Sequence, residues 1–383
     1  MSHRAPITII GAGIAGLTLA RCLRHRGISA TIYERDSLRQ ATSRHNYGIT
    51  LKRLAYQPLF DMLGIDEQTF RRRLAVDSEL GGDGYVSRKR DPDYLRANRQ
   101  RLEALLREGL DIKYEHKITD LRLHDSSNEA TLIFSNGEQT LSTQVIAADG
   151  PHSLIRRTIS PASEFNIRPF VVFNGKRRLS RSAFDADFAP YMAVAQANVL
   201  EHKTVQGTLL QISLNDVDAE KASLSYTFSR SDTPNGDDSL FTPDRPNSGA
   251  TTIPDQLFDE IAALTELSVP FSTVFAAEAM REDRLLSWLM RSAVVPESDL
   301  EGAAAKGVVL IADAAHHAPI LGSWGACEAM LDAVELAECI AEGGDQGLQD
   351  FIRTVGERWA KYVGDGEIKL EAMHETLTAS ARL

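Results

Sequence analysis

A glycine-rich turn near the N-terminus constrains the fold more than any other feature of the sequence. Residues 7–10, Ile-Thr-Ile-Ile, have the continuous apolar character of a buried parallel strand, and residues 11–16, Gly-Ala-Gly-Ile-Ala-Gly, follow directly. Residues 17–23 then carry apolar side chains at helical spacing, and residues 30–33 predict a second strand. A strand, a helix and a second strand in this order form a parallel unit with a right-handed crossover. The chain is therefore expected to open with an α/β nucleotide-binding fold.

The hexapeptide has the glycine spacing of a dinucleotide fingerprint. Gly11 permits a tight turn, Gly13 lets a pyrophosphate approach the backbone, and Gly16 lets the helix pack closely on the strand. The first helical amides, at Ile14 and Ala15, lie where a helix carries a partial positive charge, which favours phosphate. We expect all five residues to bind a dinucleotide.

A charged pair follows the second strand. The carboxylate of Glu34 can accept hydrogen bonds from ribose hydroxyls, and Arg35 can lie over the adenine. These features fit FAD and NAD equally well, so other parts of the chain must decide the cofactor.

Two later motifs resemble a known family. Residues 149–156 read Asp-Gly-Pro-His-Ser-Leu-Ile-Arg and match Asp-Gly-x-x-Ser-x-x-Arg at all four defined positions. Residues 312–319 read Ala-Asp-Ala-Ala-His-His-Ala-Pro and match, after their first residue, a Gly-Asp motif followed by Ala-Ala-His and a proline. Together with the glycine turn, these motifs resemble those of the FAD-dependent monooxygenases of the aromatic hydroxylase type, the group A flavoprotein monooxygenases.

The resemblance implies FAD as the cofactor and assigns further residues to it. Asp149 opens the second motif, and Arg99 is the arginine of the family's Arg-x-x-Leu-x-x-x-Leu helix, near the flavin or its pyrophosphate. Gly48 lies in a stretch similar to small fungal secondary-metabolite members. Asp313, at a strand end, can accept hydrogen bonds from ribityl hydroxyls at the edge of the sheet where ligands bind.

A helix follows the third motif. Residues 326–340 carry apolar side chains at helical spacing, so Gly325 and Ala326 stand at a helix N-terminus. We expect this positive end to face the flavin pyrimidine ring, where reduced flavin carries negative charge.

Three residues depart from the family pattern. Ala312 replaces a glycine, Ile320 the second of two prolines, and Cys327 an asparagine. These changes leave flavin binding intact but put the geometry at its reactive edge in question.

Strand and helix patterns beyond the motifs predict the architecture. Residues 165–230 are rich in β-branched and aromatic residues, which favours a mixed or antiparallel sheet. We expect an α/β protein: a Rossmann-like FAD-binding fold with an inserted β-sheet substrate domain and C-terminal helices. The expected boundaries are residues 1–75, 95–160 and 295–345 for the FAD-binding domain, 76–94 and 161–294 for the substrate-binding domain, and 346–383 for the C-terminal helical segment.

Composition limits the partners. Lys and Arg number 42 against 53 Asp and Glu, a net charge of −11, which disfavours nucleic acid and anionic membranes. Three irregularly spaced cysteines and an isolated His316–His317 pair indicate neither disulfides nor a metal site. With no leader and no apolar run of membrane-spanning length, we expect a cytoplasmic monomer or homodimer that does not bind membranes.

The resemblance implies a monooxygenase that takes electrons from NADPH or NADH and places one atom of O2 on a small-molecule substrate. The three departures keep a second hypothesis open, an FAD-dependent oxidase, reductase or non-redox cyclase. A non-catalytic flavin-binding protein is a third. Arg177 and Tyr226, on expected strands of the inserted domain, are candidate catalytic residues that could grip a phenolate or carbonyl.

Overall fold

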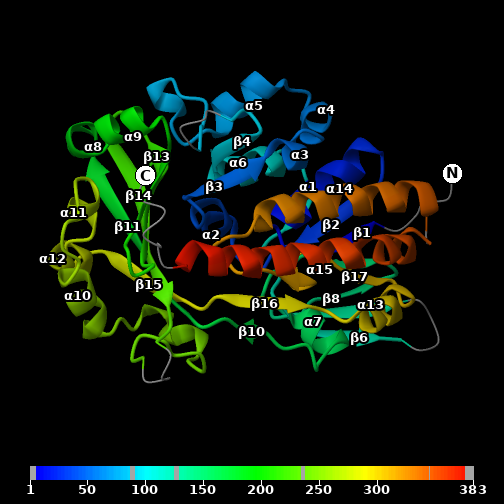
Figure 1. Ribbon diagram of the computed structural model, residues 1–383. Coiled ribbons are helices and arrows are strands. Elements are labelled where there is room, and N and C mark those ends of the chain that lie inside the picture. Colours follow the sequence, from blue (N-terminus) through cyan, green and yellow to red (C-terminus); the bar gives the residue numbers. More distant parts are fainter. Residues whose placement is uncertain (1–5, 87–90, 125–128, 234–237, 345, 376–383) are drawn as a thin grey trace.

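A five-stranded parallel sheet forms the centre of the nucleotide-binding half (Figure 1). The structure is a computed structural model that describes residues 6–86, 91–124, 129–233, 238–344 and 346–375. In spatial order the strands are β17 (Val308–Leu310), β9 (Val145–Ala147), β1 (Ile7–Ile10), β2 (Ala30–Tyr33) and β5 (Ile112–Lys113). Strands far apart in sequence thus lie side by side, and the ends of β1, β9 and β17 bring the three motifs to one edge of the sheet.

Helices pack around this sheet and build the larger apolar core. The glycine turn leads into α1 (Ile14–His25), which packs against α14 (Gly325–Gly343). The other helical elements of this half are α2 (Leu38–Ser43), α3 (Arg53–Tyr56), α4 (Leu59–Leu63), α5 (Glu67–Leu74), η1 (Ser78–Leu80), α6 (Arg99–Arg107), α7 (Leu154–Ile159), α13 (Glu297–Ala304) and η3 (Ala312–Ala314).

Two smaller antiparallel sheets flank the parallel one. One consists of β6 (Ile118–Leu123), β7 (Ala130–Phe134) and β8 (Gln139–Ser142). The other consists of β10 (Asn166–Ile167), β16 (Arg291–Val294) and β18 (His316–His317). The second sheet joins the start and end of the inserted region to the third motif.

The inserted region forms a five-stranded antiparallel sheet, as its composition predicts. Its order is β12 (Val199–Lys203), β13 (Leu209–Val217), β14 (Lys221–Ser231), β11 (Phe170–Ser180) and β15 (Arg284–Trp288). Its helices are α8 (Arg181–Asp187), α9 (Ala189–Ala195), η2 (Asn247–Thr251), α10 (Asp255–Ala262), α11 (Phe271–Val274) and α12 (Ala277–Arg281). We call this sheet the substrate sheet.

The two faces of the substrate sheet differ in chemistry because side chains alternate along each strand. On β14, Leu224, Tyr226 and Phe228 belong to an apolar cluster that includes residues of α8, α10 and α11. Ser225 and Thr227 point to the opposite face, which we call the front face. The front face meets the nucleotide-binding half and is lined by hydroxyl and amide groups.

A two-stranded ribbon connects the halves. Strands β3 (Gly48–Lys52) and β4 (Tyr94–Asn98) are antiparallel neighbours, and Leu51 and Leu95 on one side of the ribbon are buried in the larger core. The other side contacts β13, where the amide of Gly48 donates to Asn215 Oδ1 at 2.9 Å. The ribbon therefore fixes the distance between the nucleotide fold and the front face.

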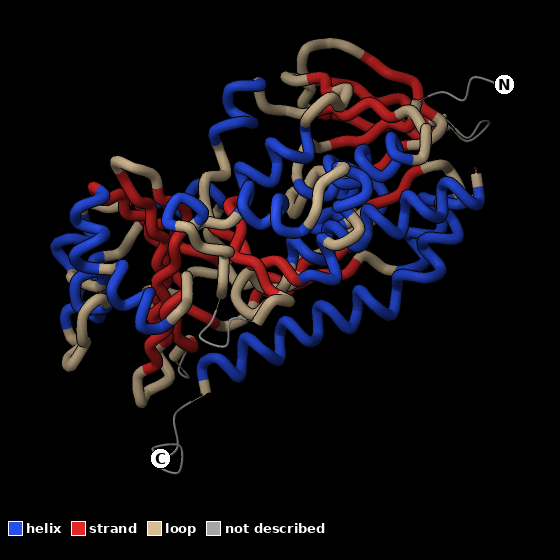
Figure 2. The backbone as a smooth tube through the Cα atoms, turned by 90° about the horizontal axis from the view of Figure 1, so that it is seen from above, coloured by secondary structure: helices blue, strands red, loops and turns tan. Residues whose placement is uncertain are grey.

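The expected C-terminal helical segment is a single long helix, α15 (Gly347–His374), which Figure 2 shows along one side of the molecule. Near its middle Trp359 Nε1 donates to Asp332 of α14 at 2.8 Å, and at its end His374 Nε2 lies 2.8 Å from Ser229 Oγ on the substrate sheet. The helix thus ties both halves together. Residues 376–383 of the expected segment lie outside the described residues.

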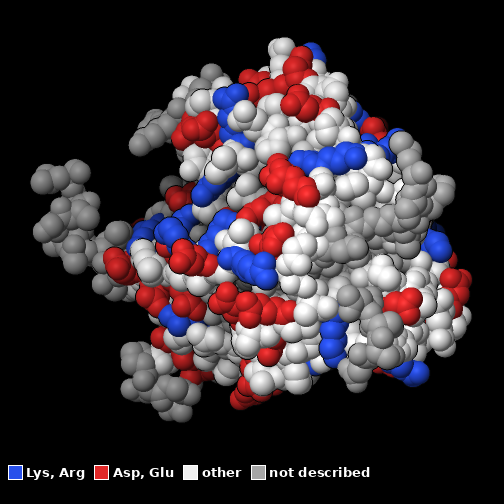
Figure 3. All heavy atoms as spheres, turned by 90° about the vertical axis from the view of Figure 1, so that its right-hand side faces the viewer, with Lys and Arg blue, Asp and Glu red and all other residues white. Residues whose placement is uncertain are grey.

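Acidic and basic side chains are intermixed over the face shown in Figure 3. Within the described part of the chain, no helix combines the length and the apolar composition that crossing a bilayer requires.

Candidate flavin site

The glycine turn after β1 leaves its backbone bare. Gly11 has φ +105°, and a Cβ there would come within 2.5 Å of the Ala148 carbonyl oxygen at the end of β9. A Cβ at Gly16 would come within 2.0 Å of the Gly11 carbonyl, so α1 can approach β1 only without a side chain. A Cβ at Gly13 would meet nothing within 4 Å, which marks the open side of the turn.

The N-terminus of α1 is free to bind an anion. Its N-cap, Gly13, has no side chain to satisfy the first amides, and the first turn, which includes Ile14 and Ala15, holds no acidic residue. These amides and the helix dipole point to the open side of the turn.

Glu34 supports the turn from β2. Its carboxylate is 3% exposed and accepts hydrogen bonds from the amides of Ala12, at 2.8 Å, and Asp36, at 3.0 Å, while Arg44 lies 3.2 Å away. Arg35 is largely exposed and 3.8 Å from Asp36. Glu34 therefore holds the turn in shape, and Arg35 stays free to move over a ligand.

The second motif follows β9. Asp149 Oδ2 accepts from the Leu154 amide at 3.1 Å, but the buried Oδ1 has no hydrogen-bond partner among the described residues, and burial raises the pKa of this carboxyl. Arg156 of the same motif donates to the Pro151 carbonyl at 2.6 Å and reaches the Asp313 carbonyl at 3.5 Å. The second and third motifs are thus in direct contact through Arg156 and the Asp313 carbonyl.

Asp313 of the third motif follows β17. Its side chain is 42% exposed, and Oδ1 lies 3.2 Å from His317 Nδ1. Burial opposes ionisation, but the neighbouring His317 and the more distant charge of Arg99 outweigh it and hold the pKa of the Asp313 carboxyl below its usual value. Asp313 therefore presents an ionised, accessible acceptor.

Arg99 at the start of α6 is held in place from two sides. Its Nε donates to Glu103 Oε1 at 2.9 Å, and Nη1 donates to the hydroxyl of Tyr47, which precedes β3. The charge of Arg99 contributes to the lowered pKa of the Asp313 carboxyl.

The start of α14 is also uncapped. Trp324 at the N-cap position makes no side-chain capping bond, so the amides of Gly325 and Ala326 have no side-chain cap, whereas the Cys327 amide donates to the Trp324 carbonyl at 2.8 Å. Cys327 in the first turn is 2% exposed, and its Sγ accepts from the Lys52 amide of β3 at 3.2 Å. Burial raises the pKa of the Cys327 thiol to about 11. Cys327 therefore joins α14 to β3 as a neutral thiol.

These residues fit an extended flavin dinucleotide. Two helix starts offer free amides, the glycine turn excludes side chains, Asp149 holds an unsatisfied buried acceptor, and Asp313 an exposed one. They lie along one edge of the parallel sheet, where ligands bind in open α/β folds.

Comparison with known proteins decides the family. A family model described as FAD dependent oxidoreductase matches residues 6–90. The FAD-dependent monooxygenase adaC of Aspergillus niger is 32% identical over 368 residues, which cover 90% of this chain and 86% of adaC. The chain belongs to the FAD-dependent monooxygenases. The FAD-dependent monooxygenase aptC of Emericella nidulans, 29% identical over 93% of this chain and 90% of its own length, agrees.

FAD is the cofactor of this monooxygenase, and the Rossmann-like fold with an inserted sheet and C-terminal helices is confirmed. The structure of CtdE in complex with FAD and its substrate has a TM-score of 0.71 at 14% identity, covering 97% of this chain and 90% of CtdE. That likeness supports the fold. The expected similarity to small fungal members is confirmed by the Aspergillus and Emericella relatives.

Arg177 and Tyr226, the two candidate catalytic residues, lie together but apart from the flavin residues of the monooxygenase. Both contact Asp283: Arg177 Nη2 at 2.7 Å and the Tyr226 hydroxyl at 2.7 Å. Arg177 also donates to the carbonyls of Thr273 and Val274 near α11, on the helix-covered face of the substrate sheet. Burial and Asp283 raise the pKa of Tyr226. Alternation along β11 and β14 directs both side chains away from the front face, so the structure gives them a packing role.

The sequence interpretation missed the polar residues of the ribbon. Thr50 and Arg96 are direct partners across β3 and β4, and Lys52 is the partner of Tyr94. Lys52 Nζ lies 4.4 Å from the Trp324 ring centre, and Lys369 Nζ of α15 lies 4.6 Å from it. About 45 residues separate the paired strands, so no local pattern could have shown that these side chains share a face.

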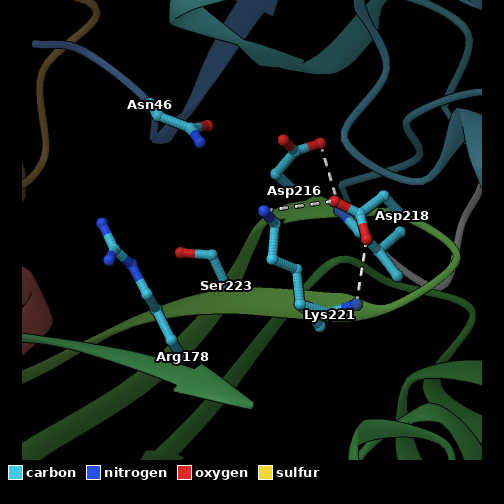
Figure 4. A pocket seen from close by; sticks show the side chains of 8 residues that line it. Asn46, Arg178, Asp216, Asp218, Lys221 and Ser223 are labelled. Carbon is cyan, nitrogen blue, oxygen red and sulfur yellow. Dashed lines mark hydrogen bonds and ion pairs between the residues drawn. The ribbon is translucent and has the colours of Figure 1, made fainter. Parts of the chain in front are cut away.

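A pocket of about 210 Å³ lies at one end of the front face (Figure 4). Lys176 Nζ donates to the Asn46 carbonyl at its border at 2.6 Å, and the side chain of Arg178 extends toward Asn46. Lys221 is paired with Asp218 at 3.8 Å. The lining residues are Asn46, Arg178, Asp216, Val217, Asp218, Lys221, Ala222 and Ser223. This end of the front face therefore carries mixed charge.

Proposed function

We propose that this monooxygenase uses NADPH or NADH and O2 to oxygenate a small organic substrate of secondary metabolism. The nicotinamide supplies two electrons, one oxygen atom enters the product, and the other leaves as water. Membership of the FAD-dependent monooxygenases and the named fungal relatives support the oxygenation chemistry. The chain has one glycine fingerprint, at residues 11–16, which agrees with a nicotinamide that binds transiently.

The observation that carries the proposal is the position of the α14 N-terminus. The uncapped first turn of α14 contacts β3 through the hydrogen bond from the Lys52 amide to Cys327 Sγ. Strand β3 in turn contacts the front face through the hydrogen bond from the Gly48 amide to Asn215 Oδ1. A flavin ring held at this helix start would therefore lie close to a hydroxyl-lined wall, which is where a substrate is needed.

We assign the flavin contacts as follows. The turn and first amides at Gly11, Gly13, Ile14, Ala15 and Gly16 hold the pyrophosphate, as at other helix N-termini. Glu34 and Arg35 hold the adenosine, and Asp313 holds the ribityl chain. Gly48, Arg99 and Asp149 complete the pocket around the pyrophosphate and ring, and Gly325 and Ala326 face the pyrimidine.

Bound FAD supplies the electron transfer and the reaction with O2. The chain orients the ring, and the amides at the start of α14 stabilise negative charge on it without having to reorganise. The ribbon, the substrate sheet and α15 surround the reacting region, which limits access of water.

The three departures from the family pattern do not favour a different reaction. Ala312 adopts the left-handed conformation, φ +54°, that a glycine would take, and Cys327 accepts a backbone hydrogen bond. Ile320 is exposed. Family membership identifies an oxidoreductase, so a non-catalytic flavin carrier is set aside. An oxidase, reductase or cyclase of the same fold is the remaining alternative.

Labelled oxygen tests the proposal. Purified protein should be yellow, release FAD on denaturation, and consume NADPH or NADH together with O2. With isotopically labelled O2, one labelled atom should appear in the product. Consumption of NAD(P)H with hydrogen peroxide as the only oxygen product for every phenolic or carbonyl substrate tried would favour an oxidase.

A further inference from the structure

Arg96 on β4 is a partly buried cation, and among the described residues it forms no ion pair with a carboxylate. The only hydrogen bond from its guanidinium within the described residues goes to Thr50 Oγ1 on β3, at 3.0 Å, and its buried Nε has no partner. Burial alone lowers the pKa of Arg96 to about 10, and no carboxylate offsets it. Shielding a guanidinium from water without an acid beside it is costly, and a charged group of this kind in a cleft is a candidate ligand contact.

The guanidinium of Arg96 occupies space that a side chain at position 48 would need. A Cβ at Gly48 would come within 2.8 Å of Arg96 Nε and 2.7 Å of the Leu214 carbonyl. Arg96 therefore lies across the bare backbone of Gly48, between the ribbon and β13. Gly48 makes room for this arginine, which is a second reason for a glycine there.

The neighbouring groups are neutral hydrogen-bonding groups, aromatic rings and the Lys52 ammonium, which lies 4.4 Å from the Trp324 ring centre. Asn98, two residues along the same face of β4, donates to Asn46 Oδ1 and to the Asn215 carbonyl. In the other direction along that face, Tyr94 lies 5.4 Å from the ring of Trp324. Residues on the same face of a strand are about 7 Å apart, so the backbone positions of Tyr94 and Arg96 are separated by roughly the length of a two-ring aromatic system.

We propose that Arg96 is the anchor for a negatively charged oxygen of the substrate, a carboxylate, phenolate or enolate on a planar ring system that packs toward Tyr94 and Trp324. The inference rests on the proposed function, because it places the substrate between the ribbon and the front face. A guanidinium binds such oxygens through two parallel N–H donors. Thr50 fixes the orientation of the guanidinium from the opposite strand.

The reduced flavin ring is a second candidate partner for Arg96, because one edge of the ring also carries negative charge on its oxygen and nitrogen atoms. The α14 N-terminus already serves that charge in the proposed arrangement, so we assign Arg96 to the substrate. The experiment below separates the two sources.

The test uses FAD-loaded protein and two matched probes, a naphthoate and the corresponding naphthamide, with calorimetry as the measurement. Wild-type protein should bind the carboxylate at least about tenfold more tightly than the amide, since hydrogen bonds to charged groups contribute that much. Arg96→Gln should abolish this preference and leave the affinity for the amide unchanged. Arg96→Lys should retain part of it.

Arg72→Gln is the matched control, because Arg72 is an exposed α5 arginine that contacts only Thr69 among the described residues. It should keep the full preference. Equal binding of the two probes by the wild type, binding of neither, or a preference that survives Arg96→Gln would overturn the assignment. A loss of FAD affinity in Arg96→Gln with the preference retained would assign Arg96 to the flavin instead.

Failure of the proposed function would look different. A protein that prefers the carboxylate through Arg96 but yields no labelled product would keep the anion site and lose the oxygenation. Flavin absorbance and thermal unfolding of each variant show whether it is folded, and Arg96→Lys keeps the test open if Arg96→Gln does not fold.

Discussion

The amide of Ala312 donates a 2.7 Å hydrogen bond to the buried carboxylate of Asp332. This bond holds the third motif in its shape, because Ala312 has φ +54° and directly precedes Asp313. Asp332 Oδ2 also lies 2.7 Å from His316 Nε2. One carboxylate on α14 thus positions both ends of the segment that presents Asp313, the residue proposed to bind the ribityl chain.

Replacing Ala312 with glycine should stabilise the protein. An alanine in the left-handed region costs about 1–2 kcal/mol, of which the larger entropy of an unfolded glycine cancels part. We expect Ala312→Gly to raise the free energy of unfolding by about 0.5–1 kcal/mol, measured by urea denaturation. Ala333→Gly, inside α14, should lower it by about 1 kcal/mol or more. A lower stability of Ala312→Gly would contradict the strain argument.

Removing the charge of Asp332 should destabilise the fold. Asp332 is 0% exposed and accepts from Arg358 at 2.9 Å, so Asp332→Asn leaves buried donors without an acceptor. We expect a loss of about 3 kcal/mol at neutral pH. Asp365→Asn, an exposed position on α15, should change stability by less than about 0.5 kcal/mol.

The effect of Asp332 should depend on pH in one direction. Burial opposes its ionisation, but His316 and Arg358 outweigh this and hold the pKa of the Asp332 carboxyl below its usual value. A lowered folded-state pKa adds stability that is complete above about pH 4 and is lost as pH falls from there through the folded-state pKa. The difference between wild type and Asp332→Asn should shrink in that acidic range. A difference that stays constant would show that folding does not lower the pKa of Asp332.

The motifs allowed the nucleotide-binding half to be predicted because each is a local pattern with one physical reason. Gly11 and Gly16 need close backbone contact, and Asp149 and Asp313 each follow a buried strand of one sheet. The carboxyl ends of neighbouring parallel strands lie at the same edge of a sheet, so motifs that are far apart in the sequence come close together there.

The substrate side was predicted less well because its chemistry depends on register. Arg177 and Tyr226 are polar residues on strands, but alternation places them on the helix-covered face beside Asp283. Arg96 and Thr50 face each other only because β3 and β4 pair across a long connection. Which face of a strand meets the ligand is decided by these pairings and not by the residue types.

The three cysteines should differ in reactivity. Burial raises the pKa of Cys22 to about 12 and that of Cys327 to about 11, so almost no thiolate exists at pH 8. Burial and neighbouring carboxylates also raise the pKa of Cys339, but its thiol is only partly buried and a reagent can reach it. A thiol reagent should therefore label at most one equivalent in native protein, at Cys339, and three after denaturation. Cys339→Ser should remove the native reaction. Rapid labelling of Cys327 in the folded protein would contradict its burial as a neutral thiol.

Tyr226→Phe should affect stability and leave turnover unchanged. The Tyr226 hydroxyl donates to Asp283 at 2.7 Å, and Asp283 keeps Arg177 as a partner when that hydroxyl is removed. We expect a loss of about 1–2 kcal/mol in the free energy of unfolding, since hydrogen bonds to charged groups are worth this much. The rate of NAD(P)H consumption and the kcat for oxygenation should stay within about twofold, because the side chain lies on the far side of the sheet from the front face. Tyr191→Phe, on α9 and partly exposed, is the control. A large fall in kcat for Tyr226→Phe at normal FAD content would restore Tyr226 as a catalytic residue.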